Sequence, residues 1–297
     1  MDIQKISREL LYKELASIWA ELESTNYAVV KGEALSQQIY SCPNMRCPSD
    51  IDILIDKDNV KLLERMLIQA GFYQQVSSDK RESRRDRILC LSHSHQIPSY
   101  HKYKFGFHLN VDINFDIFWG EYEGKRCSIS DFLSNVQDMN IYGFSVKTLP
   151  LEKAFVQLIL HHYKDMNSLY RLSQYNCIRT TMFRDINDML LLNQNRLTVE
   201  TVSDIAKKYS ITHIVYYMLY YTNLVFNSDH LRDFLIVLKC DEGDDLLTSY
   251  GLSSAERRKW SLSFEERLDN DNLWLSIIND FSEEDLKKIA LNAKVFT

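Results

Sequence analysis

The residues 46–55 read RCPSDIDILI, an apolar strand with two aspartates at its start. Successive side chains of a β-strand point to opposite faces, so Asp50 and Asp52 share one side while the isoleucines enter the core. Two negative charges this close repel each other unless a cation lies between them, and a hard cation with oxygen ligands, Mg²⁺ or Mn²⁺, is the usual partner. The stretch therefore predicts a buried strand with a metal site at one end.

A second polar face occurs in residues 107–117, which read FHLNVDINFDI. Polar and apolar residues alternate there, and the polar ones share one face of a strand: His108, Asn110, Asp112, Asn114 and Asp116. Beside the first strand, this face can hold two cations, one activating a hydroxyl and one steadying a triphosphate. The alternative is an edge strand with a solvated face. The clustering of carboxylates favours the metal site.

The organisation of the chain changes near residue 148. Before it, helical segments at the N-terminus, 33–40 and 59–70 alternate with short β-prone runs at 27–30, 51–55, 72–76, 88–91, 107–118 and 141–146. After Pro150 the periodicity is helical. The sequence predicts an α/β (α+β) domain with a small mixed sheet over residues 1–147, and an all-α C-terminal domain over residues 148–297.

The composition excludes several classes of protein. The chain has 297 residues, only eight of them glycine, and no G-x-G, so it carries neither a Walker A loop nor a Rossmann fingerprint. A net charge of −6 gives no general attraction to nucleic acid or a membrane surface. The six scattered cysteines form no C-x-x-C pair, and the start lacks an apolar signal core, so we expect a reduced, cytoplasmic protein. The charged run 80–87 favours a solvated loop over an anion-binding loop.

The motifs resemble a known superfamily. An apolar strand, the KGEA at 31–34 and the R-x-x-x-D-I-D at 46–52 resemble the polymerase-β-type nucleotidyltransferases, and more closely a bacterial family of uncharacterised nucleotidyltransferases. The resemblance implies that Asp50 and Asp52 bind both metals. It implies that Asp112 contacts the catalytic metal and helps to deprotonate the acceptor hydroxyl. It also implies a set of nucleotide-binding residues: Lys31, Gly32, Arg46, Ser49 and Lys164.

The resemblance continues into the helical part, where residues 159–164 resemble an H-x-x-K element and residues 183–190 an R-x-x-x-D helix. It implies that Lys164 holds NTP phosphates, with His161 on the same helix face. The resemblance also implies a cleft that the helical domain 148–297 completes. Arg184 and Asp188 would line or buttress this cleft, although a surface ion pair at i, i+4 explains them equally well. For His161 and His162, packing or hydrogen bonding is favoured over metal ligation, because no other histidine pair completes a zinc site.

Two positions depart from the family pattern. Glu33 replaces a small residue that touches the terminal phosphates, so phosphate contact falls on Lys31, Arg46, Lys164 and the N–H groups at a helix start. Asn114 replaces the histidine of a D-hydrophobic-H element, and Asp116 follows it on the same face. The third carboxylate is therefore either Asp112 or Asp116.

Together these observations predict a transferase that moves a nucleoside monophosphate from an NTP such as ATP. The acceptor would be a hydroxyl or phosphate of a peptide, sugar or small molecule, with Mg²⁺ or Mn²⁺ as cofactor and pyrophosphate as the second product. No nucleic acid or membrane partner is expected. Two alternatives stay open: a catalytically weak nucleotide-binding regulatory or scaffold module, and transfer of a phosphosugar-type group by the same metal site.

Overall fold

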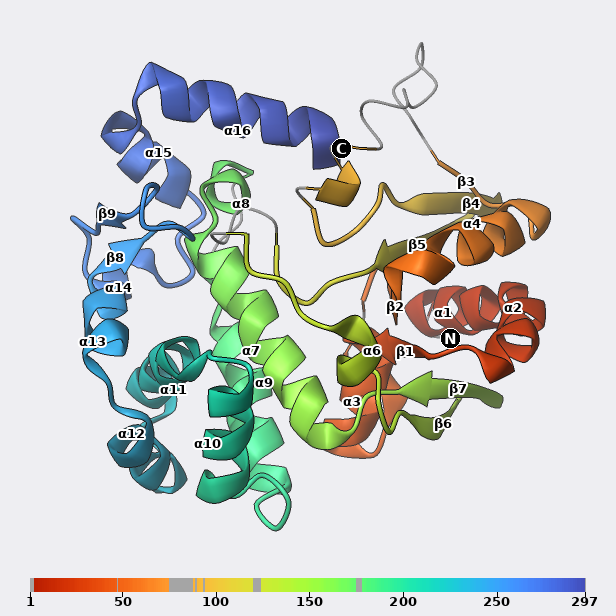
Figure 1. Cartoon of the computed structure of the whole chain (residues 1–297), viewed down its shortest axis with the longest axis horizontal. Helices are drawn as coiled ribbons and strands as arrows, with labels where there is room; N and C mark the ends of the chain where they lie inside the picture. Colours follow the sequence, from red (N-terminus) through yellow and green to blue (C-terminus); the bar gives the residue numbers. More distant parts are fainter. Residues whose placement is uncertain are drawn as a thin grey trace. The chain divides into compact units, whose positions relative to one another are not determined.

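The computed structural model describes residues 3–46, 48–74, 88, 90–92, 94–119, 124–174 and 178–296. Contacts within the chain divide it into two compact units (Figure 1). The first, here called the sheet unit, holds most of the residues up to 154, and the second, the helical unit, runs from 155 to 294. The charged run 80–87 of the sequence lies outside the described residues.

A mixed sheet of seven strands organises the sheet unit, in the order β3-β4-β5-β2-β1-β7-β6. The central strand β2 runs antiparallel to β1 and parallel to β5. The strands are β1 (Tyr27–Val30), β2 (Ile51–Ile55), β3 (Tyr73–Gln74), β4 (Tyr100–Lys104), β5 (Phe107–Asn114), β6 (Gln137–Ile141) and β7 (Phe144–Thr148). The helices are α1 (Ile3–Glu14), α2 (Ala16–Glu21), α3 (Gly32–Tyr40), α4 (Val60–Gln69) and α6 (Ile129–Phe132).

One face of this sheet carries the core, as the alternation of the sequence predicts. The isoleucines of β2 are at most 1% exposed, as are Leu109, Val111 and Ile113 of β5, and they share one cluster with apolar side chains of α1, α2 and α4. Helix α4 reaches this cluster through Val60, Leu63 and Leu67, whose spacing places them on one helix face. The polar side chains of β5 therefore point to the other face of the sheet.

Some predicted strands differ from the observed ones. The predicted strand 141–146 is a hairpin, because Tyr142 and Gly143 both have positive φ and turn β6 directly into β7. Residues 88 and 90–92 are helical, so the strand predicted at 88–91 is wrong. A short apolar run does not distinguish a strand from a buried helix, which explains that error.

The helical unit surrounds a buried helix, α11, whose Tyr217 and Tyr221 are at most 2% exposed. These tyrosines belong to the core of the helical unit. A two-stranded pair, β8 with β9, adds a small antiparallel element to the predicted helices. The elements are α7 (Leu151–Asn167), α8 (Leu169–Ser173), α9 (Thr180–Leu192), α10 (Val199–Lys208), α11 (Thr212–Phe226), α12 (Arg232–Leu238), α13 (Asp241–Leu247), β8 (Ser249–Tyr250), β9 (Arg258–Lys259), α14 (Phe264–Arg267), α15 (Leu273–Ile277) and α16 (Glu283–Phe296).

The predicted fold class is thereby confirmed: a mixed α/β part with a small sheet is followed by a helical C-terminal part. Within the described part of the chain, Cys42, Cys90, Cys127 and Cys240 are free thiols. No helix among the described residues has the length and apolar character needed to cross a membrane.

Candidate functional site

A strained turn connects β1 to α3 at Lys31 and Gly32. Both residues have positive φ, 57° and 38°. A Cβ on Gly32 would lie 3.1 Å from the side chain of Pro48, so this position requires glycine for two reasons, its backbone conformation and the close approach of the neighbouring loop. A non-glycine residue in such a conformation stores strain, which is common at functional sites. The turn holds the start of α3 beside the residues Asp50 to Asp52.

Two aspartates lie side by side on adjacent parallel strands. Asp52 of β2 pairs in register with Asp112 of β5. The Lys31 ammonium contacts Asp52 Oδ1 at 2.6 Å, and the Asn114 amide donates a hydrogen bond to the same oxygen at 3.1 Å. The strand alternation of the sequence therefore brings Asp52, Asp112 and Asn114 together. The lysine at the end of β1 supplies a positive charge beside these aspartates.

Burial and mutual repulsion raise the pKa of two aspartates in this cluster. Burial, and then the charges of Asp52 and Asp50, raise the pKa of Asp112 to about 7. Burial and the charge of Asp52 also raise the pKa of Asp50, against the opposing effect of Lys31. Burial alone would lower the pKa of Lys31, but the carboxylate of Asp52 raises it overall. One ammonium thus compensates only part of the negative charge, as expected of a place where a cation binds.

A buried ion pair fixes the backbone beside this cluster. Arg8 of α1 and Glu33 of α3 are 6% and 1% exposed, and both guanidinium nitrogens Nε and Nη2 donate to the Glu33 carboxylate. Arg8 Nη2 also donates to the Asp50 carbonyl oxygen at 2.8 Å. Glu33 is therefore bound to Arg8, and this pair joins the N-terminal helix to the site. The sequence flagged Glu33 as a departure, but nothing local points to Arg8, because the two lie 25 residues apart.

The remaining predicted residues of the sheet unit lie around the cluster. Ser49 is exposed, and its carbonyl oxygen accepts from the Asn110 amide at 3.4 Å. The backbone N–H of Arg46 donates to Ser36 Oγ at 3.2 Å. The sequence interpretation missed Ser99, whose hydroxyl donates to Asp112 Oδ1. This serine precedes β4 in the chain, and only the strand pairing places it beside Asp112.

Asp116 lies beyond the end of β5 and has other partners. Its carboxylate accepts from the backbone N–H groups of Phe118 at 2.9 Å and Cys127 at 3.4 Å, and it pairs with Arg126 at 3.5 Å. These contacts join two segments of the loop that follows the strand. Of the two alternatives left open by the sequence, Asp112 is thus the one that the strand register places beside Asp52.

Asp116→Asn should therefore change stability little and leave the predicted nucleotide transfer intact. Burial raises the pKa of Asp116, so its charge is not net stabilising, and the amide keeps an oxygen that can accept from Phe118 and Cys127. We expect the free energy of unfolding, measured with urea, to change by less than about 1 kcal/mol. The rate of nucleotide transfer, measured well below the unfolding transition, should stay at the wild-type value. Loss of transfer in a folded Asp116→Asn protein would make Asp116 the third carboxylate.

The other predicted residues belong to the helical unit. Lys164 and His161 lie on α7, where both are partly buried, and His161 Nε2 is 3.4 Å from Asp165 Oδ2. On α9, Arg184 is exposed, and Asp188 accepts a hydrogen bond from the Asn187 amide at 3.3 Å. These contacts are internal to the helical unit, so the nucleotide-binding roles implied for its residues stay predictions.

Groups suited to a metal ion occur in both units, with different chemistry. Among the residues that the structure describes, one group of three His, Cys, Asp or Glu side chains has all its ligand atoms within 4.8 Å of one another: His161, His162 and Asp165. In the sheet unit, by contrast, an ammonium rather than a third ligand contacts Asp52. Binding of a cation to the aspartates would therefore require Lys31 to move its ammonium away from Asp52.

Aligned aspartates on neighbouring strands, facing a lysine and glycine turn, are the arrangement expected of a nucleotidyltransferase. Residues 3–227, more than half of the chain, match the family described as uncharacterised nucleotidyltransferase. The chain belongs to this family.

Comparison with solved structures finds an antigenic nucleotidyltransferase-like protein from Paracoccidioides brasiliensis, with 19% identity and a TM-score of 0.37. The alignment covers 67% of this chain and 88% of that chain. None of the curated proteins matches the sequence.

Proposed function

We propose that the chain is a metal-dependent nucleotidyltransferase that transfers a nucleoside monophosphate from an NTP to a hydroxyl or phosphate of a peptide, sugar or small molecule. The observation that carries the proposal is the register of β2 and β5, which aligns Asp52 with Asp112 beside Lys31. Membership of the nucleotidyltransferase family supports it. The acceptor classes and a cytoplasmic location come from the sequence alone.

The aspartates fit a hard dication by the chemistry of their donors. Asp50, Asp52 and Asp112 offer carboxylate oxygens, the ligands that Mg²⁺ and Mn²⁺ prefer. Their mutual repulsion, expressed in the raised pKa of Asp50 and Asp112, is relieved by positive charge. A bound ion would neutralise charge on the triphosphate and on its leaving group. The Lys31 ammonium, released from Asp52, would then be free to bind phosphate oxygens.

The proposed reaction moves one proton and exchanges one bond. The acceptor oxygen forms a bond to the α-phosphorus while the bond from that phosphorus to the bridging α–β oxygen breaks, releasing pyrophosphate. The Asp112 carboxylate would take the proton of the acceptor hydroxyl. Ser99 holds the carboxyl in place through its hydroxyl. Lys31 and the N–H groups at the start of α3 would stabilise the developing phosphate charge.

The raised pKa of Asp112 predicts a pH dependence of stability without metal. Its folded-state pKa of about 7 exceeds the usual value of 3.8, so the stability that it contributes is complete below about pH 4 and is lost as the pH rises through 7. We expect the melting temperature in EDTA to fall over this window. Asp112→Asn should flatten the fall and raise the melting temperature above pH 7. If the melting temperatures of the wild type and Asp112→Asn fell equally with pH, the raised pKa of Asp112 would be refuted.

Transfer itself is tested with α-³²P-labelled NTPs, each with Mg²⁺ and with pools of peptides, sugars and phosphorylated small molecules. The expected result is label in one acceptor pool and an equal amount of pyrophosphate. Tight NTP binding by calorimetry without product from any pool would favour the regulatory or scaffold module. Product from activated sugars but not from NTPs would favour transfer of a phosphosugar-type group.

A further inference from the structure

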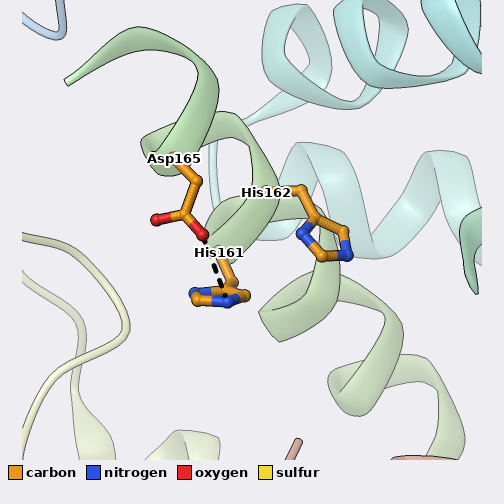
Figure 2. A group of neighbouring side chains, drawn as sticks. All are labelled: His161, His162 and Asp165. Carbon is orange, nitrogen blue, oxygen red and sulfur yellow. Dashed lines mark ion pairs between the residues drawn. The ribbon is translucent and has the colours of Figure 1, made fainter. Parts of the chain in front are cut away.

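Helix α7 of the helical unit carries a compact group of potential metal ligands, His161, His162 and Asp165 (Figure 2). His161 and Asp165 are one helical turn apart, and His162 precedes Asp165 by three residues, so all three side chains reach one side of the helix. The sequence interpretation considered the two histidines but not Asp165. Without that carboxylate, the histidine pair gives no reason to expect a metal.

The distances within this group suit a tetrahedral transition-metal ion. His161 Nε2 lies 3.4 Å from Asp165 Oδ2. Bonds of about 2.0–2.1 Å to a tetrahedral Zn²⁺ separate neighbouring ligand atoms by about 3.4 Å, so this pair already has the required spacing. The available ligand atom of His162 lies within 4.8 Å of both, a distance that a modest turn of its ring can shorten. In Figure 2 one ring nitrogen of His162 is on the side nearer to His161 and Asp165.

His162 supplies an independent reason to expect a ligand. Its side chain is only 6% exposed, and both of its ring nitrogens are buried without a hydrogen-bond partner. Buried polar groups in folded proteins nearly always have a partner, so an exception requires an explanation. A metal ion on one ring nitrogen provides that partner without any change in the backbone.

Two neighbouring residues can hold the ligands in place. Arg171 Nε donates to Asp165 Oδ1 at 2.9 Å, which leaves Oδ2 facing His161. Asp185 of α9 places Oδ2 at 3.8 Å from His162 Nε2, too far for a hydrogen bond but close enough to accept one after a small movement. A carboxylate behind a ligating histidine is the usual device that fixes the ring and raises its affinity for metal.

We propose that His161, His162 and Asp165 bind a first-row transition dication such as Zn²⁺, with Asp185 orienting His162. Two imidazoles and a carboxylate favour zinc or cobalt over magnesium, which prefers oxygen ligands only. These donors differ from the all-oxygen set of the proposed transferase site, and the proposal does not depend on nucleotide transfer. Because its ligands and Asp185 come from α7 and α9, the bound ion would also stabilise the helical unit.

The test uses the full chain after removal of metals with EDTA. Addition of Co²⁺ should give the strong visible absorption of a tetrahedral cobalt site, saturating at one equivalent and displaced by Zn²⁺ but not by millimolar Mg²⁺. His161→Ala, whose side chain is 24% exposed in the wild type, should weaken binding at least tenfold. Asp185→Asn should weaken it about 10–100-fold, because a neutral amide supports a ligating His162 ring less well than the carboxylate that lies 3.8 Å from its Nε2. Zn²⁺ should raise the melting temperature of the wild type more than that of His161→Ala or Asp185→Asn.

Matched variants make the result decisive. His108→Ala removes an exposed histidine of the sheet unit that stacks on His101, and it should bind Co²⁺ as the wild type does. The double variant D50N/D52N should also retain this binding. If His161→Ala does not fold, Asp165→Asn replaces it in the titration. The proposal is overturned if the wild type gives no saturable tetrahedral spectrum, or if folded variants at His161 and Asp165 bind Co²⁺ with wild-type affinity.

Discussion

Replacement of Asp50 and Asp52 together by asparagine should abolish Mg²⁺-dependent nucleotide transfer, with a rate loss of at least about 10³-fold. The expected loss is large because a bound metal contributes several kcal/mol of stabilisation to developing phosphate charge. The same variant should unfold near the wild-type temperature. Loss of Asp50 relieves repulsion in the cluster, and Lys31 keeps a favourable interaction with the charge of Asp112.

The matched control is Asp58→Asn, which changes the same functional group at an exposed position shortly after β2. It should keep the wild-type rate of pyrophosphate release and the wild-type Mg²⁺ dependence. Full turnover by a folded D50N/D52N variant would remove the aspartates from the catalytic site. Loss of turnover in both D50N/D52N and the control would indicate a general effect of charge.

Arg8→Met should destabilise the protein by about 3–5 kcal/mol, because it leaves the Glu33 carboxylate buried without its counter-ion. Arg8 Nη2 also holds the Asp50 carbonyl oxygen, so the backbone at the site loses a donor in the same variant. Urea unfolding measures the free energy, and calorimetry with Mg²⁺ tests whether the site loses affinity as its backbone loosens.

The double variant R8M/E33Q separates the ion pair from general packing. Removing both charges should recover a large part of the lost stability, since the cost of the single change is mainly that of an unpaired buried charge. A double variant as unstable as the sum of the single variants would contradict a direct coupling. A loss below about 1 kcal/mol in Arg8→Met would mean that water reaches Glu33.

The register of the strands shows where prediction from the sequence succeeds. The alternation of apolar and polar residues in β2 and β5 follows from the two-residue repeat of any strand, so the buried isoleucines and the shared face of Asp112 and Asn114 were predictable. The hairpin at Tyr142 was missed because its turn depends on two positive φ values that only Gly143 signals. Asp116 shared the predicted face, but β5 ends at Asn114 and the Asp116 carboxylate binds Arg126 and backbone N–H groups of the following loop.

The sequence by itself determined the order of an α/β part and a helical part, the buried strand β2 and the face of it on which Asp52 lies, because these depend on short repeats along the chain. The tertiary structure decided which partners those residues have. The pairing of Arg8 with Glu33, the alignment of Asp52 with Asp112, and the approach of Asp185 to His162 join segments that are 20 to 60 residues apart. Such contacts depend on how strands and helices pack, and no local pattern encodes them.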